Sequence, residues 1–263
     1  MPDWIAIILL GIIEGLTEFL PVSSTGHLLI AERWLPRQTD LFNIVIQCGA
    51  VLAVLPLFPN RLAQCSRALK DSAARDYVLK LLAAFIITGA GGVVLEKLHV
   101  KLPETIPPVA IALMVGGILF IVVERMLRGK PSADNVTWAI AVAVGVGQLI
   151  AAVFPGASRS GTTILISLLL GLSRPAAAEF SFLVGVPTIL AASALKIFKA
   201  LHHAPSGATS ENWTMIVLGS IVAAVVSFIS VKWLLRFVQT HTFVAFGWYR
   251  IALGVFLLFL LAV

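Results

Sequence analysis

Charged residues are scarce in this sequence. Of its 263 residues 12% are charged and 59% are hydrophobic, and the mean hydropathy is +0.99. A soluble domain carries far more charge on its surface, so the composition excludes that class of protein. It predicts an all-α polytopic membrane protein, and the length suits one integral membrane domain, 1–263, with short loops.

Cysteine is scarce too, and the start of the chain has no basic segment. Cys48 lies in an apolar run and Cys65 in a basic loop, so neither a disulfide framework nor a cysteine metal site is indicated. The first residues, Met-Pro-Asp-Trp, have no small-residue cleavage site, which predicts that no signal peptide is removed. The net charge of +6 is typical of loops beside anionic lipid, so we expect no nucleic-acid partner.

Apolar segments dominate what is present. Because a bilayer needs about 20 apolar residues per helix, six transmembrane helices are predicted. They cover residues 42–58, 78–98, 107–126, 180–199, 213–236 and 243–263. Two further regions, 4–34 and 137–172, are interrupted, and the apolar arms after their breaks are too short to span. We expect two re-entrant helical hairpins there, since irregular backbone at that depth must be enclosed by protein or a polar cavity.

The two interrupted regions resemble each other. At one constant spacing, Gly11 pairs with Gly145, Glu14 with Gln148, Pro21 with Pro155 and Ser24 with Ser158. Each region is also followed by a predicted span. This layout predicts an inverted repeat with halves of about 1–100 and 136–263.

Basic residues predict the orientation. One set of loops and span ends holds eleven: Arg61, Arg67, Lys70, Arg75, Lys80, Arg125, Arg128, Lys130, Arg174, Lys232 and Arg236. The other set holds six: Arg33, Arg37, Lys97, Lys101, Lys196 and Lys199. The positive-inside rule places the first set in the cytoplasm and both termini outside. The first hairpin then enters from outside and the second from the cytoplasm, as an inverted repeat requires.

Two carboxylates lie in the first hairpin. Glu14 and Glu18 are four residues apart, so they share one helix face. A carboxylate at membrane depth costs about 2.5–3.5 kcal/mol on insertion scales, which favours a functional role. The pair could bind a divalent cation, Mg²⁺ or Ca²⁺, or act as a base for water. The alternative is a structural pair that neighbouring groups satisfy.

A polar run follows the break at Pro21. Ser23, Ser24 and Thr25 stand where a helix would begin, and the N-terminus of a helix attracts anions such as phosphate. Plain capping by a serine is the alternative. Ser24 is the candidate nucleophile. His27, three residues on, is the candidate acid or base that exchanges its proton, although a lone histidine can also be a satisfied core residue.

The second break contains an arginine between serines. Arg159 has the planar fork that matches phosphate oxygens, and a salt bridge to Glu14 or Glu18 is the alternative. We expect the other tip residues to bind the phosphate groups: Ser23, Thr25, Gly26, Ser158, Ser160 and Gly161.

Three more charged residues lie in or beside apolar sequence. Arg174 and Glu179 are expected to pair with each other across a helix turn, in a structural role. Arg250, in the last span, has no partner that the sequence identifies.

These runs carry a family resemblance. Residues 14–27 (EGLTEFLPVSSTGH) and 155–162 (PGASRSGT), with the stretches 42–52 and 171–187, resemble the undecaprenyl pyrophosphate phosphatase family, the bacitracin-resistance type of membrane phosphatase. The resemblance implies hydrolysis of undecaprenyl pyrophosphate to undecaprenyl phosphate and inorganic phosphate, which recycles the lipid carrier of cell-wall synthesis. It also implies a divalent cation, a bacterial plasma membrane and an active site open to the outside.

Two other classes of function remain open at this stage. Inverted repeats with broken helices are a transporter layout, so the same pocket could carry a polyprenyl phosphate across the membrane. A non-catalytic membrane scaffold is the other class. The sequence leaves the oligomeric state, monomer or homodimer, undecided.

Overall fold

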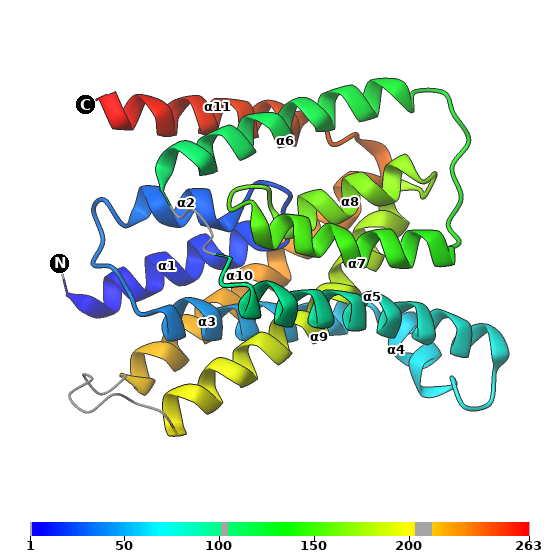
Figure 1. The fold of residues 1–263 in the computed structure, drawn as a ribbon, viewed down its shortest axis with the longest axis horizontal. Helices are drawn as coiled ribbons and strands as arrows, with labels where there is room; N and C mark the ends of the chain where they lie inside the picture. The colour runs from blue at the N-terminus through cyan, green and yellow to red at the C-terminus, as the bar shows by residue number, and fades with distance from the viewer. Residues whose placement is uncertain (1, 101–104, 203–211, 263) are drawn as a thin grey trace.

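The structure is a computed structural model that describes residues 2–100, 105–202 and 212–262. Lys101, one of the predicted outer-side cations, lies outside these ranges. The regular elements among the described residues are all helices, apart from one isolated bridge between Ala133 and Leu172. The helices in Figure 1 are α1 (Asp3–Thr17), α2 (Ser24–Ala31), α3 (Asp40–Val54), the short η1 (Leu55–Leu57), α4 (Pro59–Ser66), α5 (Ser72–Lys97), α6 (Ile106–Met126), α7 (Trp138–Val153), α8 (Arg159–Leu169), α9 (Arg174–His202), α10 (Trp213–Thr240) and α11 (Val244–Ala262).

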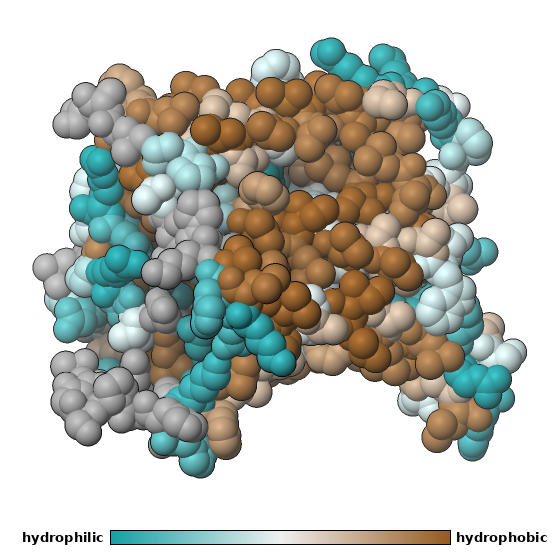
Figure 2. Space-filling model, viewed as in Figure 1, coloured by the Kyte–Doolittle hydropathy of each residue, from teal (hydrophilic) through white to brown (hydrophobic). Residues whose placement is uncertain are grey.

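The chain is an all-α polytopic membrane protein. Among the described residues, four helices are long and apolar enough to cross a bilayer: α5, α6, α9 up to Lys199, and α10. The α3 segment and α4 meet at a bend of 86°, and together they would form a fifth crossing. The apolar helix α11 is shorter than these. Every predicted span therefore coincides with a helix, while the count of six stays a prediction. Figure 2 shows the apolar side chains as a band between two polar ends.

Local sequence sets where several helices begin. The side chains of Thr39, Asp71 and Thr137 accept hydrogen bonds from backbone N–H groups in the first turns of α3, α5 and α7. Such caps satisfy donors that the helix itself leaves free. Between the ends, the helix pairs its own backbone groups, which apolar surroundings demand.

Both predicted hairpins are present as helix–break–helix units. α1 and α2 have 15 and 8 residues, and α7 and α8 have 16 and 11. At about 1.5 Å per residue, even α7 is about 24 Å long, less than the apolar core of a bilayer, which is about 30 Å thick. In Figure 1 the first hairpin starts and ends on the side of the N-terminus, and the second starts and ends on the opposite side. Their tips meet between the two ends.

Helix pairing follows the same inverted plan. α1 packs on α10 as α7 packs on α5, and α6 packs on α11. Glycines make both hairpin contacts close: a Cβ on Gly11 would lie 2.8 Å from the carbonyl oxygen of Gly219, and one on Gly145 would lie 2.9 Å from that of Ala84. This reciprocal pairing agrees with an inverted repeat. The boundaries of about 1–100 and 136–263 stay a prediction, and α6 lies between them.

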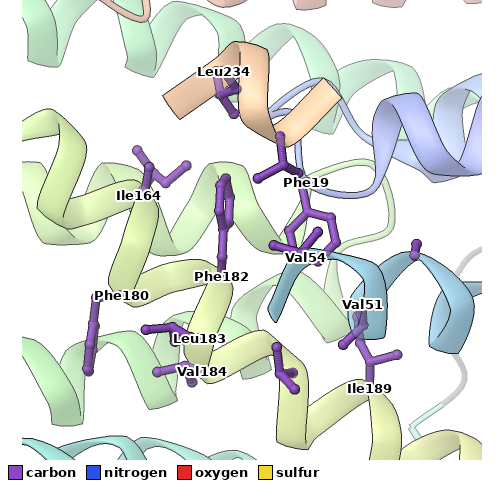
Figure 3. Packing of buried hydrophobic residues seen from close by; sticks show 14 of the residues in the cluster. Phe19, Val51, Val54, Ile164, Phe180, Phe182, Leu183, Val184, Ile189 and Leu234 are labelled. Carbon is purple, nitrogen blue, oxygen red and sulfur yellow. The ribbon is translucent and has the colours of Figure 1, made fainter. Parts of the chain in front are cut away.

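An apolar core surrounds the two tips. In Figure 3 Phe19, from the first tip, lies beside Phe182 of α9, and their ring centroids are 5.1 Å apart in an edge-on arrangement. Val51 and Val54 of α3 and Ile164 of α8 belong to the same buried cluster. Since this core excludes water, polar groups at the tips must find partners within the protein.

Gly49 tests the close packing of α3 on α10. A Cβ there would lie 2.2 Å from the carbonyl oxygen of Ser220, whereas a Cβ on Gly89 of α5 would meet nothing within 4 Å. We expect Gly49→Ala to destabilise the detergent-solubilised protein by about 1–3 kcal/mol and to lower its melting temperature. The control Gly89→Ala should leave the melting temperature unchanged or raise it, because alanine favours helix over glycine. Equal melting temperatures for the two variants would contradict this packing.

Candidate active site

A polar cavity of about 200 Å³ lies where the two hairpin tips meet. Six predicted site residues line it: Glu18, Ser23, Ser24, Thr25, Ser158 and Arg159. Gln47 of α3 lines it as well and was not predicted. Its only signal in the sequence is a side-chain amide in an apolar span, four residues after that of Asn43. The structure therefore brings the two motifs, more than a hundred residues apart in sequence, into one chamber.

The two tips have the same local geometry. Ser23 precedes α2 with a φ of 71°, and Ser158 precedes α8 with a φ of 67°. Such left-handed backbone is unusual outside glycine and is typical of functional sites. The residues that start the two helices, Ser24 and Arg159, are therefore structural equivalents. The sequence pairing of Ser24 with Ser158 is therefore wrong by one residue. The positive-φ serines, Ser23 and Ser158, are the equivalent positions, and aligning the two prolines misses this.

Glu18 connects the two motifs. Its Oε2 accepts a hydrogen bond from Ser24 Oγ at 3.1 Å, and its Oε1 lies 3.1 Å from Arg159 Nη2. The two charged side chains are 8% and 15% exposed, so little water screens the ion pair. The expected alternative, a salt bridge between the hairpins, is confirmed for Glu18.

Arg159 lies in a slot that a glycine leaves open. A Cβ on Gly185 of α9 would lie 1.8 Å from Arg159 Nη1, so any side chain there would displace the guanidinium. The guanidinium carbon is 5.8 Å from the ring centroid of Phe19. Its Nε has no hydrogen-bond partner among the described residues, and its Nη1 makes only a long contact of 3.5 Å to the carbonyl oxygen of Ser181. The fork therefore keeps donors available for an anion.

Glu14 lies one helical turn before Glu18 and is completely buried. Neither of its carboxylate oxygens has a hydrogen-bond partner in the described part of the chain. A buried carboxylate in this position needs a proton or a cation. The described residues contain no cluster of three or more His, Cys, Asp or Glu that could hold a metal alone. Only Glu18 of the pair lines the cavity, so the two carboxylates fit a hard cation only if water or substrate oxygens reach Glu14 and complete the shell.

Neither hydrogen bond of the His27 ring goes to Ser24. Its Nδ1 is 2.8 Å from the carbonyl oxygen of Ser23, and its Nε2 is 2.6 Å from the hydroxyl of Tyr249 on α11. Because a carbonyl only accepts, Nδ1 carries a hydrogen, and in the neutral imidazole Nε2 then accepts from the tyrosine. The expected proton exchange between His27 and Ser24 is therefore corrected: the Ser24 hydroxyl donates to Glu18 instead. Tyr249 was not predicted.

Three predicted tip residues make packing contacts outside the lining of the cavity. Ser160 Oγ lies 3.3 Å from the carbonyl oxygens of Glu18 and Leu20, which ties α8 to the first tip. The backbone N–H of Gly161 donates to the capping serine of α8, and Gly26 packs against α6. Their role in binding substrate stays a prediction.

Arg250 of α11 holds both tips together. It is completely buried and donates to the carbonyl oxygen of Pro21 at 3.1 Å in the first tip. It also donates to those of Gly156 at 3.1 Å and Ala157 at 2.9 Å in the second tip. A Cβ on Gly116 of α6 would lie 2.2 Å from its Nη2, so a second glycine leaves room for this guanidinium. The sequence offered no partner because carbonyl groups carry no residue identity.

The expected pairing of Arg174 with Glu179 is wrong. Arg174 Nε lies 2.9 Å from Oε1 of Glu124 on α6, and Glu179 Oε1 lies 2.6 Å from Nε of Arg61 on α4. Glu124 also accepts from the backbone N–H of Phe243, which precedes α11. Contacts between helices thus replace the local one, and they join α6, α9 and α11 at one end of the bundle.

The hydrogen bonds from Arg250 to both hairpin tips, which we call the Arg250 clasp, predict a loss of activity when this residue is substituted. Arg250→Met should leave the carbonyls of both tips without donors, at about 1–3 kcal/mol for each buried group. Arg250→Lys should not rescue it, since one ammonium cannot reach both tips. We expect both variants to lose most of the kcat for the phosphate release that the family resemblance implies, while still eluting as a single species from size-exclusion chromatography. More than half of the wild-type kcat in Arg250→Met would remove the residue from this role.

Comparison with known proteins supplies the family. A family model described as bacitracin resistance protein BacA matches residues 7–256. The undecaprenyl-diphosphatase of Rhizobium johnstonii is 48% identical over 257 residues, 97% of this chain and 96% of the relative. That of Xanthomonas euvesicatoria pv. vesicatoria is 49% identical over 98% of this chain and 97% of the relative. That of Xylella fastidiosa strain 9a5c is 49% identical over 95% of this chain and 96% of the relative. The chain therefore belongs to the BacA family, to which its two hairpin motifs point.

Proposed function

We propose that this protein is an undecaprenyl-diphosphatase that hydrolyses undecaprenyl pyrophosphate to undecaprenyl phosphate and inorganic phosphate. The observation that carries the proposal is Glu18, which binds Ser24 and Arg159 in one cavity between two helix N-termini. A hydroxyl, a base and an anion-binding fork in contact are the parts that phosphoryl transfer requires. The names of the relatives supply the substrate.

Binding begins with an exchange of partners at Arg159. Without substrate, the ion pair with Glu18 keeps both charges satisfied inside the apolar core. A phosphate group that enters the cavity offers oxygens to the same fork, which suits it in a bidentate way. The N-termini of α2 and α8 open on the cavity and favour an anion. Glu18 is then released to act as a base.

The reaction transfers the terminal phosphoryl group. In one route, Ser24 Oγ attacks the terminal phosphorus, its proton passes to Glu18, and the bond to the bridging oxygen breaks to release the polyprenyl phosphate. Water then hydrolyses the phosphoserine. In the other route, Ser24 orients a water molecule that Glu18 deprotonates, this water attacks the same phosphorus, and the bond to the bridging oxygen breaks to release the polyprenyl phosphate. In both routes positioning and charge neutralisation lower the barrier.

A divalent cation, Mg²⁺ or Ca²⁺, is part of the proposal. Glu14 and Glu18 would hold it together with substrate oxygens and water, since the unpartnered oxygens of Glu14 provide hard donors. Such a cation would neutralise charge on the phosphate oxygens. Arg159 remains the anchor that this chain itself supplies.

We propose further that the protein lies in the bacterial plasma membrane with its cavity open to the outside. The excess of Lys and Arg on one set of loops supports this orientation. The first hairpin enters from the opposite, N-terminal side, which would then be the outside (Figure 1).

A transporter is the second candidate, and one observation favours it. The reciprocal packing of α1 on α10 and α7 on α5, with hairpins entering from opposite sides, is the plan of inverted-repeat transporters. Phosphate release by purified protein in detergent, where transport has no meaning, separates the two functions.

Arg159 gives the first test of the hydrolase. We expect Arg159→Ala to fall below about a tenth of the wild-type rate of phosphate release, because losing a clamp on a transferring phosphoryl group costs several kcal/mol. Arg159→Lys should also be poor, since an ammonium lacks the planar fork. Size-exclusion chromatography controls for folding. A rate above about a tenth of the wild-type rate in Arg159→Ala would show that the arginine does not bind the reacting phosphate. A stable wild-type protein that releases no phosphate would favour a non-catalytic scaffold.

The carboxylates give the second test. We expect Glu18→Gln to lower kcat by about 10²-fold or more, the usual loss of a general base. Glu14→Gln should mainly raise the concentration of Mg²⁺ or Ca²⁺ that gives half-maximal activity. The measurement is phosphate release against added metal after chelation. A wild-type rate that chelator leaves unchanged would show that neither carboxylate serves a metal.

Thr25 tests the orientation, because it is exposed and lines the cavity. Thr25→Cys, in a background with Cys48→Ser and Cys65→Ser, should react with a membrane-impermeant thiol reagent in intact spheroplasts. Pyrophosphate should slow the reaction by occupying the cavity. Labelling confined to inverted vesicles would reverse the proposed orientation.

A further inference from the structure

A long apolar groove runs beside the polar cavity. α6, α7 and α8 enclose a volume of about 810 Å³, which we call the α6–α8 groove. Its walls include Val115 and Leu119 of α6, Phe154 of the second tip, and Ile166 and Leu169 of α8. Of the described side chains that line it, only that of Thr162 is polar. The surface over α6 and α7 in Figure 2 lies within the apolar band, so the groove is at membrane depth.

The groove and the cavity share one wall. Phe154 and Ala157 of the second tip line the groove, while Pro155, Gly156 and Ser158 of the same tip line the cavity. Successive residues of one short turn therefore face two chambers. The wall that separates an apolar chamber from a phosphate-sized polar one is a single segment of backbone, 154–158.

We propose that the α6–α8 groove binds the isoprenoid tail of the substrate whose pyrophosphate occupies the polar cavity. The inference rests on the proposed function. A polyprenyl pyrophosphate has one charged end and one long apolar chain, and these adjacent chambers of opposite polarity match the two parts. The chain would pass over the edge of segment 154–158, where Phe154 is exposed. Along α8 the groove extends from the tip to Leu169, about 15 Å beyond Arg159 at 1.5 Å per residue.

The groove contributes position more than affinity. The tail is already in hydrocarbon when it lies in the bilayer, so entry into the groove yields packing contacts and no transfer from water. Its effect is to hold the head group in register with Arg159 and Ser24. A blocked groove should therefore weaken binding of a long-chain substrate moderately, and it should spare the chemical step once the head group is bound.

Two pairs of neighbouring residues provide matched tests. Leu119 and Ile118 of α6 are 46% and 52% exposed, and Leu119 lines the groove whereas Ile118 does not. Leu169 and Leu170, at the end of α8, are 53% and 46% exposed, and again only the first lines the groove. Tryptophan at any of the four positions adds a similar bulk to an already exposed apolar site. Only Leu119→Trp and Leu169→Trp place it in the groove.

The measurement is KM and kcat for phosphate release from undecaprenyl and farnesyl pyrophosphate, at one detergent concentration, with size-exclusion chromatography as the folding control. We expect Leu119→Trp and Leu169→Trp to raise the KM for the undecaprenyl substrate about three- to tenfold with kcat within about twofold. The KM for the shorter farnesyl substrate should rise less. Ile118→Trp and Leu170→Trp should match the wild type with both substrates.

The outcomes separate the two proposals. If both groove variants match their neighbours while the wild type is active, the groove holds ordinary lipid chains and the inference is overturned. A KM that rises equally for the two substrates overturns it as well, because chain length then does not matter. If the folded wild type releases no phosphate from either substrate, the proposed function fails first, and the inference falls with it. If one groove variant does not fold, the other pair decides.

Discussion

The clasp that Arg250 makes on both hairpin tips is the interaction on which the site depends. A broken helix leaves carbonyl groups without partners, and in an apolar interior each such group is costly. One guanidinium donates to carbonyls of both tips, at Pro21 in one and at Gly156 and Ala157 in the other. One side chain thereby provides hydrogen-bond donors for carbonyl groups at both breaks, and it holds the two tips at a fixed distance from each other. Its own charge is compensated by oriented carbonyl dipoles.

Once the tips are held, the ion pair of Glu18 with Arg159 follows. Both arginines occupy space that a glycine leaves free, Gly185 for Arg159 and Gly116 for Arg250. The equivalent first residues of α2 and α8, Ser24 and Arg159, each take one oxygen of the same carboxylate. An approximate inverted symmetry has thus produced an asymmetric site, with a hydroxyl on one side and a cation on the other. That asymmetry is what a phosphoryl transfer needs.

The surroundings of the site explain how an amphiphile could reach it. The Phe19 and Phe182 rings close the core beside Arg159, and the second tip separates the polar cavity from the α6–α8 groove. Phosphate and hydrocarbon chain can then each remain in surroundings of their own polarity. The excess of basic side chains at the far end of the bundle bears on orientation and not on the site itself.

The sequence by itself determined what depends on neighbours along the chain. Apolar length predicted the helices, proline and glycine predicted the two breaks, and a carboxylate pair, a serine run and an arginine at those breaks predicted the site. Only the tertiary structure decided what depends on partners from distant segments. In the folded protein, His27 hydrogen-bonds to Tyr249, Arg174 binds Glu124, and Arg250 donates to backbone carbonyls. The physical reason is that helix formation is a local property of apolar sequence, whereas the partner of a buried polar group depends on which helices pack together.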